Sequence, residues 1–226
     1  LNVPPQLSQV FVPSHVQNGA NIHTNSWGSM NTKYDNFSSM ADDVMWQYPE
    51  LLLVFAAGNS GIDKDKDGRI DPGSVGSPGS AKNVMTVGAS ENNVANLGKQ
   101  KTCGELRPDS WGTEPIKSSK LSDNPNGIAC FSSVGPTPDG RIKPDIVAPG
   151  TNILSTQSQA PDANPLWGLY NQYYSFSGGT SMATPLAAGA SALARQYLRS
   201  LGIQKPSAAL LKGVMMHAAR DLFPGQ

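Results

Sequence analysis

The stretch FSGGTSMATPLAAGASALA, residues 176–194, joins a glycine-rich turn to a long run of small residues. From Met182 onward alanine and leucine dominate, and no charged residue occurs before Arg195. A helix that is apolar on nearly every side belongs inside a protein. Pro185 is compatible with such a helix if the helix begins at or just before Ser181, because the first-turn N–H groups have no intrahelical partner. The stretch therefore predicts a buried helix with one serine at its N-terminus.

Ser181 at such a position has two interpretations. A helix N-terminus offers unpaired backbone N–H groups and the positive end of the helix dipole, which suit an oxyanion forming beside the serine. Gly178 and Gly179 add no side-chain bulk ahead of it, so a substrate backbone could approach closely. The alternative is an ordinary N-cap, because serine is a common capping residue.

The segments around this stretch alternate between strand-like and helix-like patterns. Short apolar runs closed by glycine or small polar residues are typical of buried parallel strands. Strands that alternate with helices predict an α/β domain with a mostly parallel sheet. The predicted strands lie within residues 20–28, 50–61, 83–90 and 141–150, and the predicted helices within residues 6–18, 36–48, 182–199 and 207–219. The polar residues 99–127 are interpreted as a surface excursion, and residues 155–174 as a loop-rich stretch.

Asn59 follows the apolar run of residues 51–57 and lies between Gly58 and Gly61. An amide on a glycine-rich turn at the carboxyl edge of a strand can direct its NH2 group at a ligand, and α/β proteins form their sites at such edges. The alternative is a turn asparagine that tolerates a left-handed conformation. The sequence NSWGS, residues 25–29, offers a second such strand edge.

The overall composition excludes several classes of partner. The chain has 226 residues, enough for one sizeable domain, and its 17 Lys and Arg residues balance 17 Asp and Glu residues. A net charge of zero provides no electrostatic footprint for nucleic acid or an anionic membrane. The longest apolar run, residues 51–57, is far too short to span a bilayer. We therefore expect neither nucleic acid nor a membrane as partner.

Cys103 and Cys130 are the only cysteines, and both lie in or next to the polar excursion. A disulfide between them would close a loop and remove roughly 3 kcal/mol of chain entropy from the unfolded state. The alternative is two unpaired thiols. The disulfide is the preferred interpretation, and it predicts an oxidising compartment, so that the protein is expected to be secreted or extracellular.

Four motifs together resemble those of the subtilisin-like serine proteases, the subtilases. GTSMATP at residues 179–185 matches the nucleophile motif of that family, and AAGNSG at residues 56–61 matches the segment that holds its oxyanion asparagine. HTNSWG at residues 23–28 resembles its substrate-binding strand and loop, and residues 132–150 resemble the strand segment before the nucleophile. The motifs occur in the family's order. The resemblance implies a three-layer subtilisin-like fold with a mostly parallel sheet and a buried central helix that starts at the nucleophile.

The resemblance also implies roles for individual residues. Ser181 would form an acyl-enzyme with a polypeptide substrate, and Asn59 with the Ser181 N–H would hold the tetrahedral oxyanion. The walls of the specificity cleft would be formed on one side by Ser26, Trp27 and Gly28, and on the other by Ala56, Ala57 and Gly58.

The base and the carboxylate that a serine nucleophile needs have no matching motif in this chain. The family supplies them in D-[ST]-G and H-G-T-H settings, and neither sequence is present. His15, His23 and His217 lie in helix or strand patterns without such a setting, so we expect structural roles for them. Residues 1–226 are therefore interpreted as the C-terminal two-thirds of a catalytic domain, which needs its N-terminal segment as a partner and is inactive without it.

The sequence DKDKDGRID, residues 63–71, has the alternating carboxylates of a calcium loop. Alternating Asp residues can converge on one hard cation, and Gly68 permits the sharp turn. The twelfth position holds Ser74 where an EF-hand has Glu, and no helix pattern flanks the loop, so a non-helical calcium loop is the preferred interpretation. The alternative is a solvated loop whose basic residues offset the acidic ones. The predicted calcium ligands are Asp63, Asp65, Asp67 and Asp71.

Two other functions remain to be compared with a protease. A non-catalytic subtilase-like module could bind polypeptide or serve as a scaffold, although retention of both Ser181 and Asn59 argues against decay of a catalytic site. An esterase of the α/β-hydrolase type would need glycine two residues after the nucleophile, and Ala183 occupies that place. A serine endopeptidase is the leading hypothesis.

Overall fold

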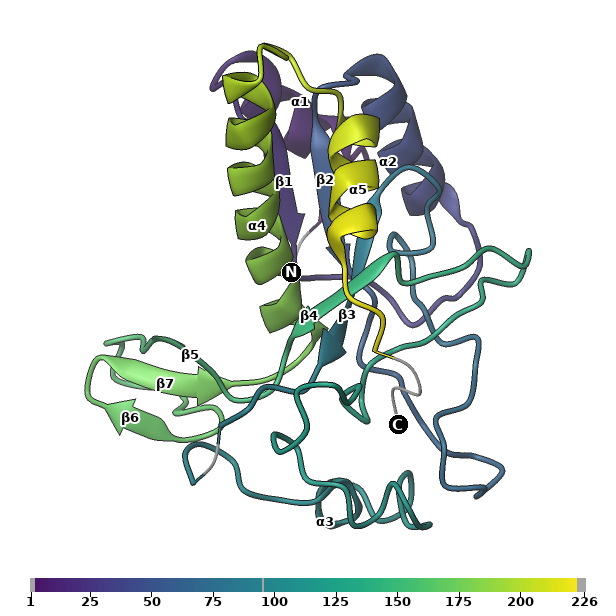
Figure 1. Ribbon diagram of the computed structural model, residues 1–226, viewed down its shortest axis with the longest axis vertical. Helices are drawn as coiled ribbons and strands as arrows, with labels where there is room; N and C mark the ends of the chain where they lie inside the picture. Colours follow the sequence, from purple (N-terminus) through teal and green to yellow (C-terminus); the bar gives the residue numbers. More distant parts are fainter. Residues whose placement is uncertain (1–2, 95, 223–226) are drawn as a thin grey trace.

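The computed structural model describes residues 3–94 and 96–222 and centres on a parallel sheet of four strands (Figure 1). The strands follow in space the order β1-β2-β3-β4 that they have in the chain. The middle strands β2 and β3 are buried along their whole length, as their apolar sequences predict. The four strands are β1 (Ile22–Asn25), β2 (Leu52–Ala56), β3 (Met85–Ser90) and β4 (Ile146–Pro149).

Helices cover both faces of this sheet and make the domain a three-layer structure. Helix α1 (Ser8–Val16) packs on α2 (Asn36–Gln47) on one face, while α4 (Thr180–Ser200) and α5 (Ala208–Ala218) lie on the other (Figure 1). The predicted α/β class with its parallel sheet is confirmed. The first helix runs through Pro13, although a proline inside a helix would be expected to interrupt it.

Helix α4 packs against all four strands of the sheet, but only one of its sides is buried. Small residues such as Ala183 and Ala187 on the sheet side let the helix approach the strands closely. On the opposite side, Leu186, Leu193 and Tyr197 are 44%, 68% and 63% exposed. The prediction of a helix buried all around is therefore correct for the sheet side and wrong for the outer side.

Residues 153–177 form a second sheet that projects from the body of the molecule (Figure 1). This projecting sheet is antiparallel, with the order β5-β7-β6, and replaces the loop expected for residues 155–174. Its strand β7 leads directly into the turn before Ser181. The three strands are β5 (Ile153–Thr156), β6 (Leu169–Asn171) and β7 (Tyr174–Ser177).

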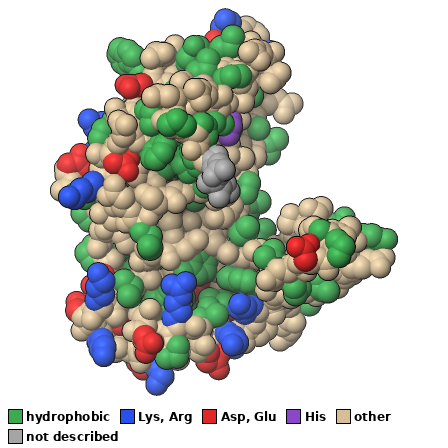
Figure 2. Space-filling view, turned by 180° about the vertical axis from the view of Figure 1, so that it is seen from behind, with side chains coloured by type: hydrophobic (Ala, Val, Ile, Leu, Met, Phe, Trp, Pro, Cys, Tyr) green, Lys and Arg blue, Asp and Glu red, His purple; other side chains and the backbone are tan. Residues whose placement is uncertain are grey.

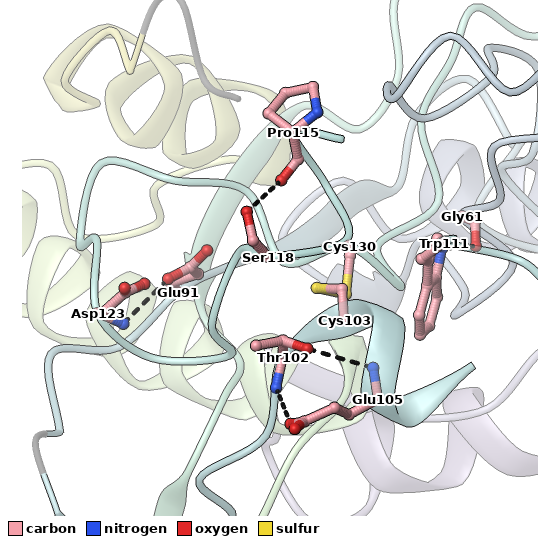
Figure 3. Close-up of a disulfide and its surroundings, with 10 residues drawn as sticks. All are labelled: Gly61, Glu91, Thr102, Cys103, Glu105, Trp111, Pro115, Ser118, Asp123 and Cys130. Atoms are coloured by element: carbon pink, nitrogen blue, oxygen red, sulfur yellow. Dashed lines mark hydrogen bonds between the residues drawn. A yellow bond between two sulfur atoms is a disulfide. The ribbon is translucent and has the colours of Figure 1, made fainter. Parts of the chain in front are cut away.

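The polar excursion of residues 99–127 is tied firmly to the domain (Figure 3). It contains the short helix α3 (Cys103–Leu106), whose first residue forms a disulfide with Cys130, with Cα atoms 6.4 Å apart. Thr102 and Glu105 cap this helix reciprocally. Trp111 is fully buried and donates a hydrogen bond of 3.2 Å from Nε1 to the Gly61 carbonyl. The excursion therefore holds a fixed position although its sequence is mostly polar.

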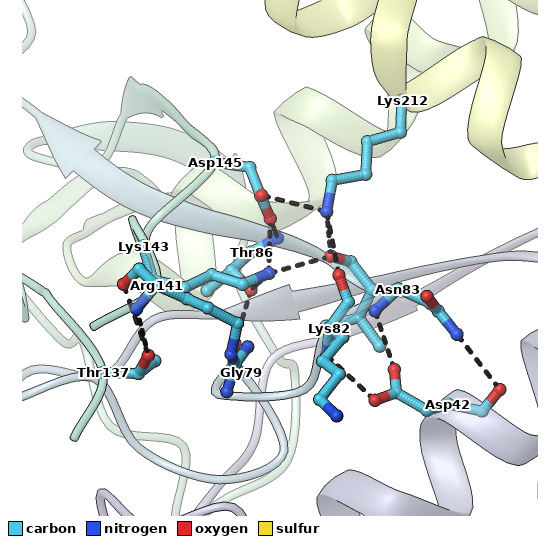
Figure 4. A network of polar contacts seen from close by, with 11 residues as sticks. Asp42, Gly79, Lys82, Asn83, Thr86, Thr137, Arg141, Lys143, Asp145 and Lys212 are labelled. Atoms are coloured by element: carbon cyan, nitrogen blue, oxygen red, sulfur yellow. Dashed lines mark hydrogen bonds and ion pairs between the residues drawn. The ribbon is translucent and has the colours of Figure 1, made fainter. Parts of the chain in front are cut away.

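A buried ionic cluster joins the last helix to the sheet (Figure 4). The Asp145 carboxylate accepts from Lys143 Nζ at 2.6 Å and from Lys212 Nζ on α5 at 2.9 Å. Burial lowers the pKa of Lys143 to about 8, although the neighbouring Asp145 charge opposes the shift. Removing Asp145 would leave two neighbouring lysines without their counter-charge, so this carboxylate ties α5 to the sheet.

Within residues 3–94 and 96–222, no helix combines the length and the apolar character that crossing a bilayer requires.

Candidate active site

Ser181 lies in the first turn of α4, one residue after the helix begins. The N-cap is Gly179, whose φ of 142° suits glycine alone and which has no side chain to cap the helix. Ser181 is therefore not the capping residue, which removes the ordinary structural explanation of this serine. Its Oγ is half-buried and donates a hydrogen bond of 3.3 Å to the Ser26 carbonyl.

Pro185 changes the hydrogen bonding of the Ser181 carbonyl group. It is the sixth residue of α4, beyond the first turn where its missing N–H was expected to cost nothing. A proline at this place leaves the Ser181 carbonyl without its helical donor, because that donor would be the N–H four residues later. The Ser26 hydroxyl fills the gap and donates to the Ser181 carbonyl at 2.7 Å. The two serines are thus joined by two hydrogen bonds across the cleft.

Asn59 stands at the carboxyl end of β2 and is connected to the same helix end. Its Oδ1 accepts hydrogen bonds from the backbone N–H and the Oγ1 of Thr180, at 2.9 and 3.1 Å. The Thr180 hydroxyl in turn accepts from the Gly58 N–H at 3.3 Å. Because Oδ1 is occupied at the helix, the NH2 group of Asn59 is the end that remains for a ligand.

Two hydrogen-bond donors at the site have no acceptor among the residues that the structure describes. One is Asn59 Nδ2 and the other is the Ser181 backbone N–H. The N-terminal turn of a helix presents such free N–H groups together with the positive end of its dipole. This arrangement can receive a negative oxygen that develops beside Ser181 Oγ.

These groups open onto a cleft of about 250 Å³, which we call the Ser181 cavity. Trp27 forms part of its wall and is held edge-on to Phe55, with ring centroids 5.3 Å apart. Gly76 also lines it, and a Cβ there would lie 1.9 Å from the Ser29 carbonyl oxygen, so only glycine fits. All eight residues that the sequence assigned to catalysis and substrate binding line this cavity: Ser26, Trp27, Gly28, Ala56, Ala57, Gly58, Asn59 and Ser181.

Five further lining residues were not assigned from the sequence: Ser29, Met30, Ser60, Gly76 and Thr180. Thr180 has the largest structural role among them, because its fully buried side chain links Asn59 to Gly58. Its place beside Ser181 in the nucleophile motif was the available signal. Gly76 is brought in from a segment far from the motifs, where no local pattern marks it.

None of the three histidines lines the Ser181 cavity. His15 Nδ1 is 2.9 Å from the Ala20 carbonyl oxygen, and the ring packs against Tyr48. His23 on β1 lies against the ring of Phe11 on α1, and burial lowers the pKa of His23. His217 is exposed on α5. Among the residues that the structure describes, those lining the cavity include no histidine and no charged side chain.

The acidic loop brings three of its four predicted carboxylates together. Ligand oxygens of Asp63, Asp65 and Asp67 lie within 4.8 Å of one another. Asp63 is buried and also accepts hydrogen bonds from the N–H groups of Asp67 and Gly68, at 3.0 and 3.1 Å. Asp71 instead accepts from the Lys64 N–H and is not part of the cluster.

The sequence and the fold of this chain were compared with those of known proteins. A family model described as the Subtilase family matches residues 6–226. Serine protease/ABC transporter B family protein tagD of Dictyostelium discoideum is 32% identical over 285 aligned residues, which cover 97% of this chain and 15% of tagD. Serine protease AprX of Bacillus subtilis is 36% identical over 150 residues, which cover 65% of this chain and 26% of AprX. The chain thus spans a minor part of these relatives.

Among solved structures, the prenylagaramide maturation protease PagA matches 95% of this chain and 57% of its own, with a TM-score of 0.60 at 21% identity. That similarity concerns the fold alone. The family model covers nearly the whole chain, and both relatives named here are serine proteases. The chain belongs to the subtilase family.

Proposed function

We propose that this chain forms part of a serine endopeptidase that cleaves polypeptides through an acyl-enzyme on Ser181. The observation that carries the proposal is the pair of free donors, Asn59 Nδ2 and the Ser181 N–H, at the mouth of the cleft that holds Ser181 Oγ. A scaffold would have no need for two unpaired donors beside an accessible hydroxyl. Donors of this kind are the largest single source of stabilisation in acyl transfer.

In the proposed reaction, substrate binds in an extended form between the edges at residues 26–28 and 56–58, as an added strand. Ser181 Oγ attacks the peptide carbonyl carbon and gives its proton to a base. The carbonyl oxygen becomes negative and is held by Asn59 and the Ser181 N–H. The base then protonates the departing amine, and water hydrolyses the resulting ester by the reverse sequence.

The base and its orienting carboxylate are proposed to come from an upstream segment of the same domain. Three observations support such a partner. Among the described residues β1 pairs with β2 alone and so forms an open sheet edge, and the outer side of α4 exposes apolar side chains such as Leu193 and Tyr197. A second open cavity of about 600 Å³ lies between Ile22 and Arg195, along the same edge. Without that segment the chain is expected to be inactive, because Ser181 has no base.

A fluorophosphonate probe tests both parts of the proposal, since it reacts with an activated serine. The chain alone should not be labelled, while the protein that includes the upstream segment should be labelled on Ser181, as located by peptide mapping. Ser181→Ala should abolish the label, and Ser200→Ala at the far end of α4 should retain it. Labelling of neither form would contradict the protease and favour a polypeptide-binding scaffold. Labelling of the chain alone would contradict the proposal that the base comes from an upstream segment.

Calcium is proposed as a structural ion at Asp63, Asp65 and Asp67. The donor set fits a hard cation, because three carboxylates converge and Gly68, with φ of +86°, makes the sharp turn between them. The ion would offset the repulsion among these carboxylates and hold the loop closed. The disulfide between Cys103 and Cys130 supports a second proposal, that the protein works in an oxidising compartment outside the cell.

A further inference from the structure

Another cleft, separate from the Ser181 cavity, also borders Asn59. It has a volume of about 260 Å³, and we call it the cationic cavity. Asn59 lines both clefts, while Gly178 and Gly179, the two residues before the nucleophile turn, line only the cationic cavity. The two clefts are therefore neighbours that share the carboxamide expected to hold the oxyanion.

The lining of the cationic cavity contains two positive charges, Lys99 and Arg107, and no carboxylate. Neither cation forms an ion pair within the part of the chain that the structure describes. Each is instead placed over an aromatic ring. Lys99 Nζ is 5.2 Å from the ring centroid of Trp167, and the Arg107 guanidinium carbon is 5.3 Å from that of Trp111. Both charges thus remain available to an anionic ligand.

The Lys99 side of the cavity is fixed by buried contacts. The side chain of Asn152, itself 1% exposed, accepts from the Lys99 N–H at 2.8 Å and donates to the Lys99 carbonyl at 3.2 Å. Trp167 lies directly on Gly178, where a Cβ would be 1.9 Å from the indole ring. The Trp167 ring also meets Phe131 edge-on.

The Arg107 side is fixed by the excursion shown in Figure 3. Arg107 ends helix α3, which the disulfide and the Thr102–Glu105 cap hold in place. Its partner Trp111 is 1% exposed and bonded to the Gly61 carbonyl. Figure 2 shows several basic side chains, with acidic ones among them, on the lower part of the body near the base of the projecting sheet. The two cations are therefore presented by rigid supports, which lowers the entropy lost when a ligand binds.

The position of the cavity identifies the part of a substrate that would reach it. The acyl side of the substrate occupies the Ser181 cavity between residues 26–28 and 56–58. Asn59 marks the carbonyl that is attacked, so the residues on the leaving-group side continue past Asn59, over Gly178 and Gly179. These residues meet the cationic cavity.

The geometry points to a specificity subsite for a carboxylate on the leaving-group side of the scissile bond, recognised by Lys99 and Arg107. This inference rests on the proposed endopeptidase function. The carboxylate is either the side chain of Asp or Glu, or the free C-terminus of a substrate cleaved near its end. Trp167, which is half-buried, forms the aromatic wall against which the stem of such a residue packs.

The test uses the full-length enzyme and fluorogenic peptides that are identical on the acyl side. Glu, Gln or Lys is placed at the first or the second position after the scissile bond, with an amidated C-terminus. A further peptide carries Gln at that position and ends there in a free carboxylate. At one of the two positions, kcat/KM should be about fivefold higher for Glu than for Gln, and at least tenfold higher than for Lys. The preference should weaken as NaCl is raised from 0.05 to 0.5 M, because partly exposed charges are screened.

Variants attribute the preference to the two cations. Arg107→Gln and Lys99→Met should each reduce the Glu-to-Gln ratio, and together they should bring it close to one. Lys101→Gln removes an exposed charge from the same segment outside the cavity and should retain the ratio. A faster reaction of the free-acid peptide than of the Glu amide would identify the chain terminus as the source of the carboxylate.

Equal rates for Glu, Gln and Lys at both positions, with no faster hydrolysis of the free-acid peptide, would overturn this inference while leaving the endopeptidase intact. A preference for Glu that survives in the double variant would overturn it as well. Hydrolysis of none of the peptides would overturn the proposed function and, with it, the subsite.

Discussion

Replacement of Asn59 probes the proposed oxyanion site directly. Asn59→Ala removes the Nδ2 donor and also the two hydrogen bonds that Oδ1 accepts from Thr180. The donor acts on a charge that exists only in the transition state, so its loss should lower kcat by about 10²–10³, or roughly 2.7–4 kcal/mol, and change KM little. The reference case for this magnitude is subtilisin, itself a subtilase.

Asn59→Asp separates catalysis from folding. It retains an oxygen that can accept both hydrogen bonds from Thr180, but it replaces the donor by an anion that repels the oxyanion. We expect kcat to fall at least as far as in Asn59→Ala. The Ala variant should also lose about 1–2 kcal/mol of the free energy of unfolding, because its two hydrogen bonds disappear, while the Asp variant should lose less.

The assay is initial-rate hydrolysis of a fluorogenic peptide by the full-length enzyme, with thermal unfolding of each variant as a control for folding. Two results would refute the reasoning. One is a kcat within a few fold of the wild type in both variants. The other is a loss of kcat/KM that comes from KM alone, since that would mean uniform binding of substrate rather than stabilisation of the oxyanion.

Two further predictions concern stability. If calcium binds the acidic loop, EGTA should lower the Tm by about 5 °C and added Ca²⁺ should restore it, because a ligand at 100 times its Kd adds about 2.7 kcal/mol to the free energy of unfolding. Asp65→Asn should abolish this response to EGTA. A Tm that EGTA does not change would exclude the ion. Burial raises the pKa of Glu91 from 4.5 to about 7, so the folded state binds this proton more tightly. The tighter proton binding adds up to about 3 kcal/mol to the free energy of unfolding. This contribution is complete below pH 4.5 and is lost as the pH rises through 7. Glu91→Gln should therefore flatten the dependence of the free energy of unfolding on pH between pH 5 and 8, as measured by chemical denaturation. Glu114→Gln should leave this dependence unchanged. The same dependence in Glu91→Gln as in the wild type would contradict the raised pKa of Glu91.

The site could be located from sequence because its parts lie at strand ends. The apolar runs before Ser26 and Asn59 identify two neighbouring parallel strands, and the carboxyl ends of such strands meet at one edge of the sheet. The helix that starts beside Ser181 adds the third component at the same edge. These patterns depend on residues close together in the chain, and the resemblance to the subtilases supplied the roles expected of the individual residues.

Other features depend on contacts between residues far apart in the chain. Local polarity indicated a loop at residues 155–174, whereas pairing along β7 makes it a sheet. Asp71 has the right spacing for a ligand, but its carboxylate accepts from Lys64 instead of joining the cluster. The exposed side of α4 was also hidden from the sequence, since an apolar surface does not reveal whether anything covers it.

The sequence by itself determined the α/β class, the strand ends and the residues around Ser181, because hydrophobic periodicity and the glycine-rich turn before Ser181 are properties of short segments. Only the tertiary structure decided that Oδ1 of Asn59 is held by Thr180, that Ser26 replaces the helical donor lost at Pro185, and that Lys99 and Arg107 share one cleft. Each of these depends on the distance between groups that are distant in sequence. Such distances are set by the packing of the whole domain.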